Sequence, residues 1–189
     1  MLVKEIVPGR RAVFLDRDGV INEDRDDYVK SLSEFEFLPG TRAALRELSG
    51  APFLIVIVTN QPALHRGLMT YSALAEIHDH LLSTVKADGG RIDAVYYCPH
   101  TSGENCGCRK PRPGLFLQAA QDLGIDPNNN YCVGDKLSDL EAGQSVGCQG
   151  IWVQPAGSEG QAGGSEHGYR VVADLREAVG WILSQESAR

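Results

Sequence analysis

The 189-residue sequence contains no uninterrupted apolar run that approaches the roughly 18 residues of a membrane-spanning helix. Charged residues interrupt the amino-terminal stretch MLVKEIVPGRRAVFLD too early for a signal peptide. The sequence also lacks an excess of positive charge, since its formal net charge is -7 and binding to a nucleic-acid backbone requires a basic face. We therefore predict a cytoplasmic protein with no membrane or nucleic-acid partner, in which any anionic ligand meets local positive charge.

What the sequence does contain is an alternation of apolar, strand-like runs with segments of helical periodicity, which is typical of a parallel α/β sheet. The predicted strands are 11–16, 53–60, 93–98, 131–135 and 150–153, with an edge strand in 169–185. The predicted helices are a segment opened by Pro39-Gly40 and closed by Gly50, one capped by Thr70 and stopped by Gly89-Gly90, 113–124, 138–146 and a closing helix in 169–185. The length fits a single domain, 1–189, with helices on both faces of one Rossmann-like sheet, and the glycine-rich segment 155–168 predicts a mobile loop.

Polar side chains follow several of the predicted strands, at the edge where an open parallel sheet binds its ligands. They are Asp16, Asp18, Thr59, Asn60, Asp135 and Asp139, joined by Lys110 from the segment after the third strand. A single aspartate after a strand is more simply a turn or helix-cap residue. The convergence of four carboxylates, a hydroxyl, an amide and a lysine instead favours a catalytic site.

Such a set of groups suits phosphoryl transfer. A carboxylate attacks phosphorus only when a divalent cation offsets the repulsion between two anions. We therefore predict Asp16 as the nucleophile, with Mg²⁺ bound by Asp16, by Asp135 and by the main-chain carbonyl of Asp18. The Asp18 side chain would protonate the leaving oxygen and later activate water, while Thr59 and Lys110 would stabilise the phosphoryl oxygens.

Cys98, His100, Cys106 and Cys108 form a dense Cys-x-His-x5-Cys-x-Cys cluster, which we predict to be a zinc loop over 98–108. Three thiolates and one imidazole make a closed tetrahedral set, as structural zinc prefers. Two other interpretations are that the four residues are unrelated and that they form a redox switch. The redox switch is disfavoured because Cys106 and Cys108 lack the CxxC spacing of dithiol oxidoreductases. Zinc would fix the loop that carries the next two residues, Arg109 and Lys110, and would thereby hold these cations toward the substrate.

Four motifs then resemble the haloacid dehalogenase superfamily of Mg²⁺-dependent aspartate-nucleophile phosphatases. They are FLDRDGVIN (14–22), VTNQ (58–61), CRKP (108–111) and VGDKLSD (133–139). The combination RDGVIN, TNQ…RG and YCPH…CxCRKP is similar to the heptose-1,7-bisphosphate 7-phosphatases, with histidinol-phosphate phosphatases as near relatives. The resemblance implies a nearly capless domain with zinc at the Cys/His cluster. It also implies removal of the 7-phosphate of a heptose bisphosphate on the route to nucleotide-heptose or lipopolysaccharide core, and we predict that Arg109 is directed at the second phosphate of that substrate.

The same resemblance implies substrate contacts from Asp24 and Tyr28, where the family meets sugar hydroxyls. We also predict Asn60 and Gln61 as substrate contacts, and Lys136 as a cation for a phosphate or a carboxylate. Two segments depart from the family pattern: 62–67 reads PALHRG instead of SGIARG, and 153–157 reads VQPAG instead of VRTG. Pro62 removes a hydroxyl and an N–H donor, and the second departure removes a cation.

Two other functions remain open from the sequence. Histidinol-phosphate phosphatase is the enzymatic alternative, although the dehydratase domain to which its relatives are often fused is missing from this sequence. A non-catalytic, zinc-stabilised binding module is the alternative of another class, since function lies in the site rather than in the fold. We expect a monomer acting on a small-molecule sugar bisphosphate, because nothing in the sequence marks an oligomer interface.

Overall fold

The computed structural model describes residues 9–126, 128–154 and 168–187. The strands are β1 (Arg11–Leu15), β2 (Phe53–Asn60), β3 (Ala94–Cys98), β4 (Tyr131–Gly134), β5 (Gln149–Val153) and β6 (Arg170–Val172). The α-helices are α1 (Thr41–Leu48), α2 (Tyr71–Ala87), α3 (Gly114–Leu123), α4 (Leu137–Gln144) and α5 (Leu175–Ser187), and two short 3₁₀ helices are η1 (Leu32–Glu34) and η2 (Ser102–Glu104). The predicted fold class is confirmed, with each predicted strand and helix found within a few residues of its expected bounds.

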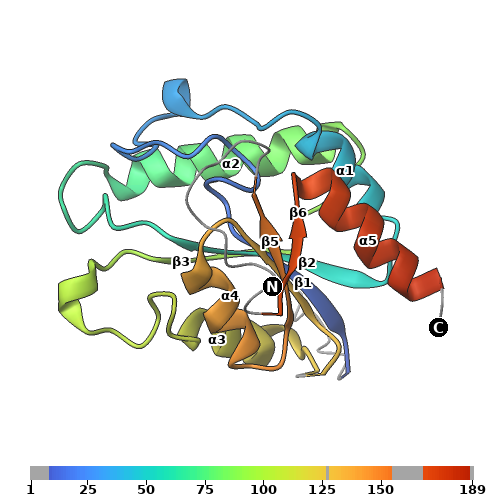
Figure 1. The fold of residues 1–189 in the computed structure, drawn as a ribbon. Coiled ribbons are helices and arrows are strands. Elements are labelled where there is room, and N and C mark those ends of the chain that lie inside the picture. Colours follow the sequence, from blue (N-terminus) through green and yellow to red (C-terminus); the bar gives the residue numbers. More distant parts are fainter. Residues whose placement is uncertain (1–8, 127, 155–167, 188–189) are drawn as a thin grey trace, which may run out of the picture.

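The six strands form one parallel sheet in the order β3-β2-β1-β4-β5-β6. Helices α1, α2 and α5 cover one face, and α3 and α4 cover the other (Figure 1). β1 lies at the centre of the sheet between β2 and β4, so the loops that follow these three strands meet at one edge. The same edge carries the loop after β3, which lies with the loops after β1 and β2 on the left of Figure 1.

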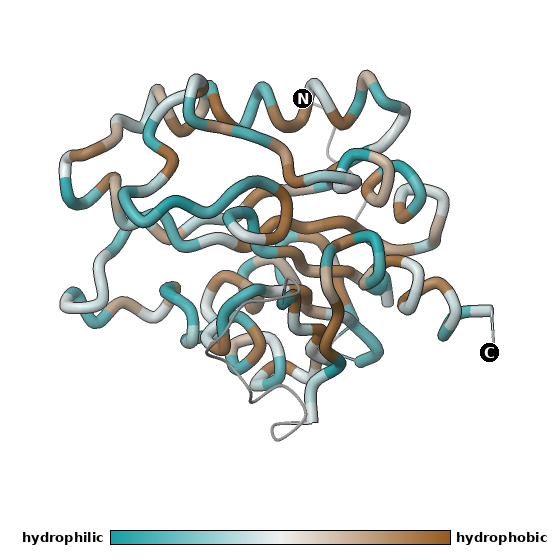
Figure 2. Tube along the Cα trace, turned by 45° about the horizontal axis from the view of Figure 1, so that its top comes forward, coloured by the Kyte–Doolittle hydropathy of each residue, from teal (hydrophilic) through white to brown (hydrophobic). Residues whose placement is uncertain are grey.

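The core consists of two apolar layers, one on each side of the sheet. Along β1, Val13 and Leu15 face the layer under α1, α2 and α5, whereas Ala12 and Phe14 face the layer under α3. In Figure 2 the hydrophobic segments gather in the central strands and the hydrophilic ones in the surrounding loops. A strand buried on both faces has few positions for polar residues, so the polar groups that follow it gather at its end.

Local signals account for the helix bounds. Thr70 caps α2 through its hydroxyl, which accepts from the N–H of Ala73 at 3.1 Å, as predicted. An apolar stripe of α2 is buried against the sheet; it consists of Leu74, Ile77, Leu81 and Val85. Among the described residues, no helix is long and apolar enough to span a bilayer. The predicted mobile loop 155–168 lies outside the described residues except for Gly168.

Candidate active site and metal centres

The loop after β1 places Asp16 and Asp18 at the carboxyl edge of the sheet. The N–H of Asp16 donates to the carbonyl of Val133 in β4 at 2.9 Å, which fixes Asp16 next to the end of that strand. Gly19 then turns the chain with φ +81°, and a side chain at this position would collide with the carboxylate of Asp135. The glycine therefore allows the main chain after Asp18 to approach Asp135 closely.

Lys110 lies in the centre of the site with a side chain only 1% exposed. Its ammonium is 2.8 Å from Asp16 Oδ1, 2.8 Å from Asp139 Oδ1, and donates to the carbonyl of Val58 at 2.7 Å. Burial disfavours its charge, but Asp139 and Asp16 outweigh burial and raise the pKa of Lys110. Asn60 holds the main chain of Lys110 from both sides, through hydrogen bonds of 3.2 and 3.1 Å.

Three side chains surround the carboxylate of Asp18. Arg17, fully buried, donates from Nη2 to both Asp18 oxygens at 2.7 and 3.0 Å. Asn22 donates to Oδ1 at 2.9 Å, and Gln61 donates to Oδ2 at 2.8 Å. Burial opposes ionisation of Asp18, but the charge of Arg17 and these hydrogen bonds hold the pKa of Asp18 below its ordinary value.

Asp16, Asp135 and Asp139 present carboxylate oxygens within 4.8 Å of one another, a spacing that allows a cation to bind between them. Asp135 Oδ1 is buried without a hydrogen-bond partner among the described residues. Burial and the charge of Asp16 raise the pKa of Asp135 to about 8, and burial and Asp139 raise the pKa of Asp16 to about 6 against the opposing effect of Lys110. Crowded, desolvated carboxylates of this kind fit Mg²⁺, which prefers oxygen ligands.

A cavity of about 560 Å³ opens above these residues. Seven of the predicted site residues line it: Asp16, Asp24, Tyr28, Asn60, Arg109, Lys110 and Lys136. Lys136 Nζ pairs with Asp24 Oδ2 at 2.7 Å across the cavity mouth, and Pro62 of the departing segment also belongs to the wall. The cavity therefore offers both carboxylates and cations to a ligand.

Four predicted residues lie beneath the cavity instead of lining it, namely Asp18, Thr59, Gln61 and Asp135. Thr59 and Gln61 are 1% and 3% exposed, and Gln61 donates to the Thr59 hydroxyl at 3.0 Å. Sequence reasoning missed the buried Arg17 and gave no role to Asp139. The available signals were the arginine between two aspartates in DRD and the aspartate three residues after Lys136 at a helix start.

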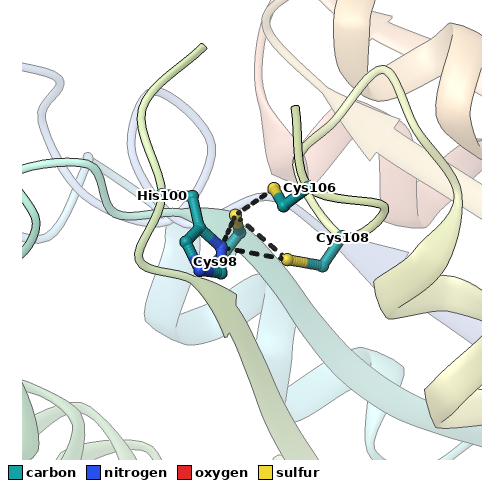
Figure 3. Close-up of side chains that lie close together, drawn as sticks. All are labelled: Cys98, His100, Cys106 and Cys108. Carbon is teal, nitrogen blue, oxygen red and sulfur yellow. Dashed lines mark hydrogen bonds between the residues drawn. The ribbon is translucent and has the colours of Figure 1, made fainter. Parts of the chain in front are cut away.

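The cysteine cluster forms a second centre, in which all four predicted side chains point toward one another (Figure 3). Cys98 Sγ lies 3.7 Å from Cys106 Sγ and 3.3 Å from Cys108 Sγ, and His100 Nδ1 lies 3.5 and 3.4 Å from the sulfurs of Cys98 and Cys108. A tetrahedral zinc ion sets sulfur–sulfur distances of about 3.8 Å and sulfur–nitrogen distances of about 3.5 Å. The cluster therefore fits zinc, whereas Cys132 and Cys148 are buried elsewhere in the core.

Arg109 and Lys110 leave this loop in different directions. Arg109 donates to the main-chain carbonyl of the predicted zinc ligand His100 at 3.0 Å and lines the cavity. Among the described residues it has no carboxylate partner, whereas Lys110 has two. The loop thus presents one compensated cation to the catalytic carboxylates and one uncompensated cation to the cavity.

Comparison with known proteins connects this geometry to phosphatases. A HAD-hydrolase-like family model matches residues 107–178. A D-glycero-beta-D-manno-heptose-1,7-bisphosphate 7-phosphatase from Bordetella bronchiseptica is 37% identical over 178 residues, which cover 93% of this chain and 99% of that protein. A D-glycero-alpha-D-manno-heptose-1,7-bisphosphate 7-phosphatase from Mycobacterium tuberculosis is 40% identical over 171 residues, covering 87% of this chain and 90% of that one.

The structural comparison agrees. The crystal structure of D,D-heptose 1,7-bisphosphate phosphatase from B. bronchiseptica, complexed with magnesium and phosphate, superposes with a TM-score of 0.86 at 38% identity. The match covers 93% of this chain and 99% of that chain.

Proposed function

The chain belongs to the heptose-1,7-bisphosphate 7-phosphatase family of the haloacid dehalogenase superfamily, and from this membership we propose that it hydrolyses the 7-phosphate of D-glycero-D-manno-heptose 1,7-bisphosphate. The observation that carries the proposal is the meeting of Asp16, Asp135, Asp139 and Lys110 at the floor of a cavity that Arg109 also lines. The product would be a heptose 1-phosphate, an intermediate toward nucleotide-heptose or lipopolysaccharide core.

In the proposed reaction, a carboxylate oxygen of Asp16 attacks the phosphorus of the 7-phosphate, and the bond between phosphorus and the sugar oxygen breaks. Asp18 gives a proton to that oxygen, so the sugar leaves as an alcohol and the phosphoryl group remains on Asp16. Asp18, now a carboxylate, takes a proton from water, which attacks the phosphoaspartate and releases inorganic phosphate. Asp16 is thereby restored.

The ligands proposed for Mg²⁺ are Asp16, Asp135 and the main-chain carbonyl of Asp18. When bound, Mg²⁺ reduces the repulsion between the carboxylate and the dianionic phosphate. Lys110, aligned by Asp139, and Thr59 hold the phosphoryl oxygens on which charge resides in the transition state. Asp18 is held as an anion in the free protein. The negative charge of the bound phosphate raises the pKa of Asp18, so that Asp18 is protonated when the leaving oxygen needs a proton.

The substrate's second phosphate is assigned to Arg109, because this cation has no carboxylate partner among the described residues. Asp24, Tyr28 and Lys136, at the cavity wall, are proposed to bind the sugar and its anionic groups. Histidinol phosphate would instead bring an ammonium group toward Arg109, so like charges would meet. This argues for a bisphosphate rather than for the enzymatic alternative.

A substrate panel tests the proposal. We expect kcat/KM for at least one anomer of heptose 1,7-bisphosphate to exceed that for histidinol phosphate by orders of magnitude. The reverse order would overturn the substrate assignment. In parallel, Asp16→Asn should abolish turnover and phosphoenzyme formation. Wild-type activity in that variant would refute the covalent mechanism, whereas a wild type without phosphatase activity would favour the non-catalytic binding module.

We further propose that the reaction takes place in the cytoplasm and that the protein acts as a monomer. The first proposal follows from the expected substrate, and the second from a catalytic set contained within one chain. Sedimentation analysis would measure the second directly.

A further inference from the structure

Gln61 follows β2 directly and lies beneath the cavity floor, 3% exposed and outside the cavity lining. Its amide nitrogen is 2.8 Å from Asp18 Oδ2 and 3.0 Å from Thr59 Oγ1. We infer that Gln61 is not a substrate contact but a positioning residue, which orients both the proton-transfer group Asp18 and the phosphoryl-binding hydroxyl of Thr59. The inference rests on the function proposed above and deepens it.

The chemistry of the three groups fixes the direction of these hydrogen bonds. In the free protein the carboxylate of Asp18 is ionised and only accepts, so the amide turns its nitrogen toward Asp18. The two N–H bonds of that nitrogen then serve Asp18 and Thr59, one each. A threonine hydroxyl has one hydrogen to donate. Because Gln61 donates to the Thr59 oxygen, the hydrogen of Thr59 remains available for an oxygen of the phosphoryl group.

Gln61 also differs from the other two side chains that hold Asp18. Arg17 and Asn22 belong to the same loop as Asp18 and move with it, whereas Gln61 comes from the end of β2. The main-chain N–H of Gln61 donates to the carbonyl of Cys98 at 2.7 Å, in the zinc cluster. Gln61 therefore links the Asp18 loop to Thr59 through its side chain, and its main chain is anchored to the main chain of the cluster.

Removing the amide should affect substrates according to their leaving groups. A sugar alkoxide is a poor leaving group and needs the proton from Asp18, whereas p-nitrophenolate leaves without one. In Gln61→Met, which keeps the length of the side chain and removes both N–H groups, kcat/KM for heptose bisphosphate should fall about 10²-fold. The loss with p-nitrophenyl phosphate should be at least tenfold smaller, and the KM for the bisphosphate should stay within about twofold, because the side chain does not line the cavity.

The experiment compares wild type, Gln61→Met and Gln61→Glu with both substrates, with thermal unfolding measured for each variant. Gln61→Glu keeps the shape of the side chain but places a carboxylate against Asp18, so it should show the same dependence on leaving group. Gln118→Met makes the same chemical change on the exposed surface of α3 and should match the wild type.

Equal losses with the two substrates would overturn the positioning role. So would a rise in KM for heptose bisphosphate at unchanged kcat, which would identify a direct substrate contact. Failure of the wild type to hydrolyse heptose bisphosphate would instead contradict the proposed substrate, and the comparison would then use the alkyl phosphate that the wild type does hydrolyse.

Discussion

At the scale of single residues, the function of each buried polar group depends on whether it lines the cavity or lies beneath it. Asp16 and Lys110 reach the cavity, while Asp18, Thr59 and Gln61 form a hydrogen-bonded layer beneath it. Sequence reasoning could find the strand-end residues because parallel strands end at a common edge. It could not tell which amide faces the substrate and which faces another side chain, because that depends on contacts between separate loops.

Gly19 gives a sharp test of the close approach between the Asp18 loop and Asp135. In Gly19→Ala, the new methyl group would meet the Asp135 carboxylate, and φ +81° is unfavourable for alanine. We expect loss of Mg²⁺ affinity and a fall in kcat/KM of more than about 10²-fold, because a displaced ligand set also misplaces the reacting groups.

Isothermal titration with Mg²⁺ and steady-state kinetics measure both effects. Gly180→Ala, in α5, is the matched control, because a methyl group there would contact nothing within 4 Å. Wild-type Mg²⁺ affinity in Gly19→Ala would contradict the proposed closeness of the loop to the metal site.

At the scale of elements, helix α2 supports the catalytic loop through a buried histidine. Arg17 Nη1 lies 3.4 Å from His78 Nε2, and since arginine can only donate, the histidine nitrogen accepts and the ring is neutral. Burial and the charge of Arg17 lower the pKa of His78 to about 4. The apolar residues of α2 recur with the period of a helix that packs on one face, but this pattern could not reveal that a histidine on the same helix contacts an arginine from the loop after β1.

This histidine predicts acid sensitivity. Its pKa is lower in the folded protein than the ordinary 6.5, so the unfolded state binds a proton first as the pH falls. The contribution of His78 to stability is therefore complete above pH 6.5 and is lost between pH 6.5 and 4, by at most about 3 kcal/mol. Urea unfolding of His78→Gln should show a shallower pH dependence over this range, whereas His80→Gln, an exposed change on the same helix, should keep the wild-type slope. Equal slopes in wild type and His78→Gln would contradict the prediction.

The loop between β3 and α3 predicts a separate effect of zinc removal. Its only helix is the short η2, and the four-residue cluster joins the beginning of the loop to Cys108, two residues before Lys110. Cys106→Ser should lose zinc and at least about tenfold in kcat/KM, while far-UV circular dichroism stays close to the wild type because the sheet is packed independently.

Metal analysis and kinetics of Cys106→Ser should be paired with Cys148→Ala, which removes a buried cysteine outside the cluster and should keep its zinc. A zinc-free, folded protein with full kcat and KM would show that the loop positions Lys110 without the metal.

At the scale of the whole molecule, the sequence predicted the class of fold, the bounds of most elements and the two sets of metal-ligand candidates. The strand order β3-β2-β1-β4-β5-β6 could not be predicted from the sequence, because an apolar run predicts a strand but not which other strands pair with it in the sheet. The order matters for function: β1 at the centre brings Asp16 between the ends of β2 and β4, from which Thr59 and Asp135 extend. The buried carboxylates of this site also make the stability of the folded protein depend on pH.

Burial and the charges of neighbouring carboxylates raise the pKa of Asp16 to about 6 and that of Asp135 to about 8, above their unfolded values. A carboxyl group whose pKa is higher in the folded than in the unfolded protein stabilises the fold at low pH and loses that contribution as the pH rises. The free energy of unfolding of the metal-free protein should therefore decrease between about pH 4 and pH 8. Mg²⁺ binds the ionised carboxylates and should reverse this loss. At a hundred times its dissociation constant it contributes about 2.7 kcal/mol, or roughly 5–10 °C in Tm.

The increase in Tm on adding Mg²⁺ should therefore be larger at pH 8 than at pH 6, where protons compete for the same oxygens. Asp135→Asn should raise the Tm of the metal-free protein at pH 8, since it removes a buried charge, and should remove most of the response to Mg²⁺. Asp174→Asn changes a carboxylate next to α5, away from the site, and should respond to Mg²⁺ as the wild type does. If the increase in Tm on adding Mg²⁺ were independent of pH and persisted in Asp135→Asn, the cation would bind elsewhere. If Asp135→Asn both raises the Tm of the metal-free protein and loses the response to Mg²⁺, the buried charges that bind the metal are the same ones that lower the stability of the fold.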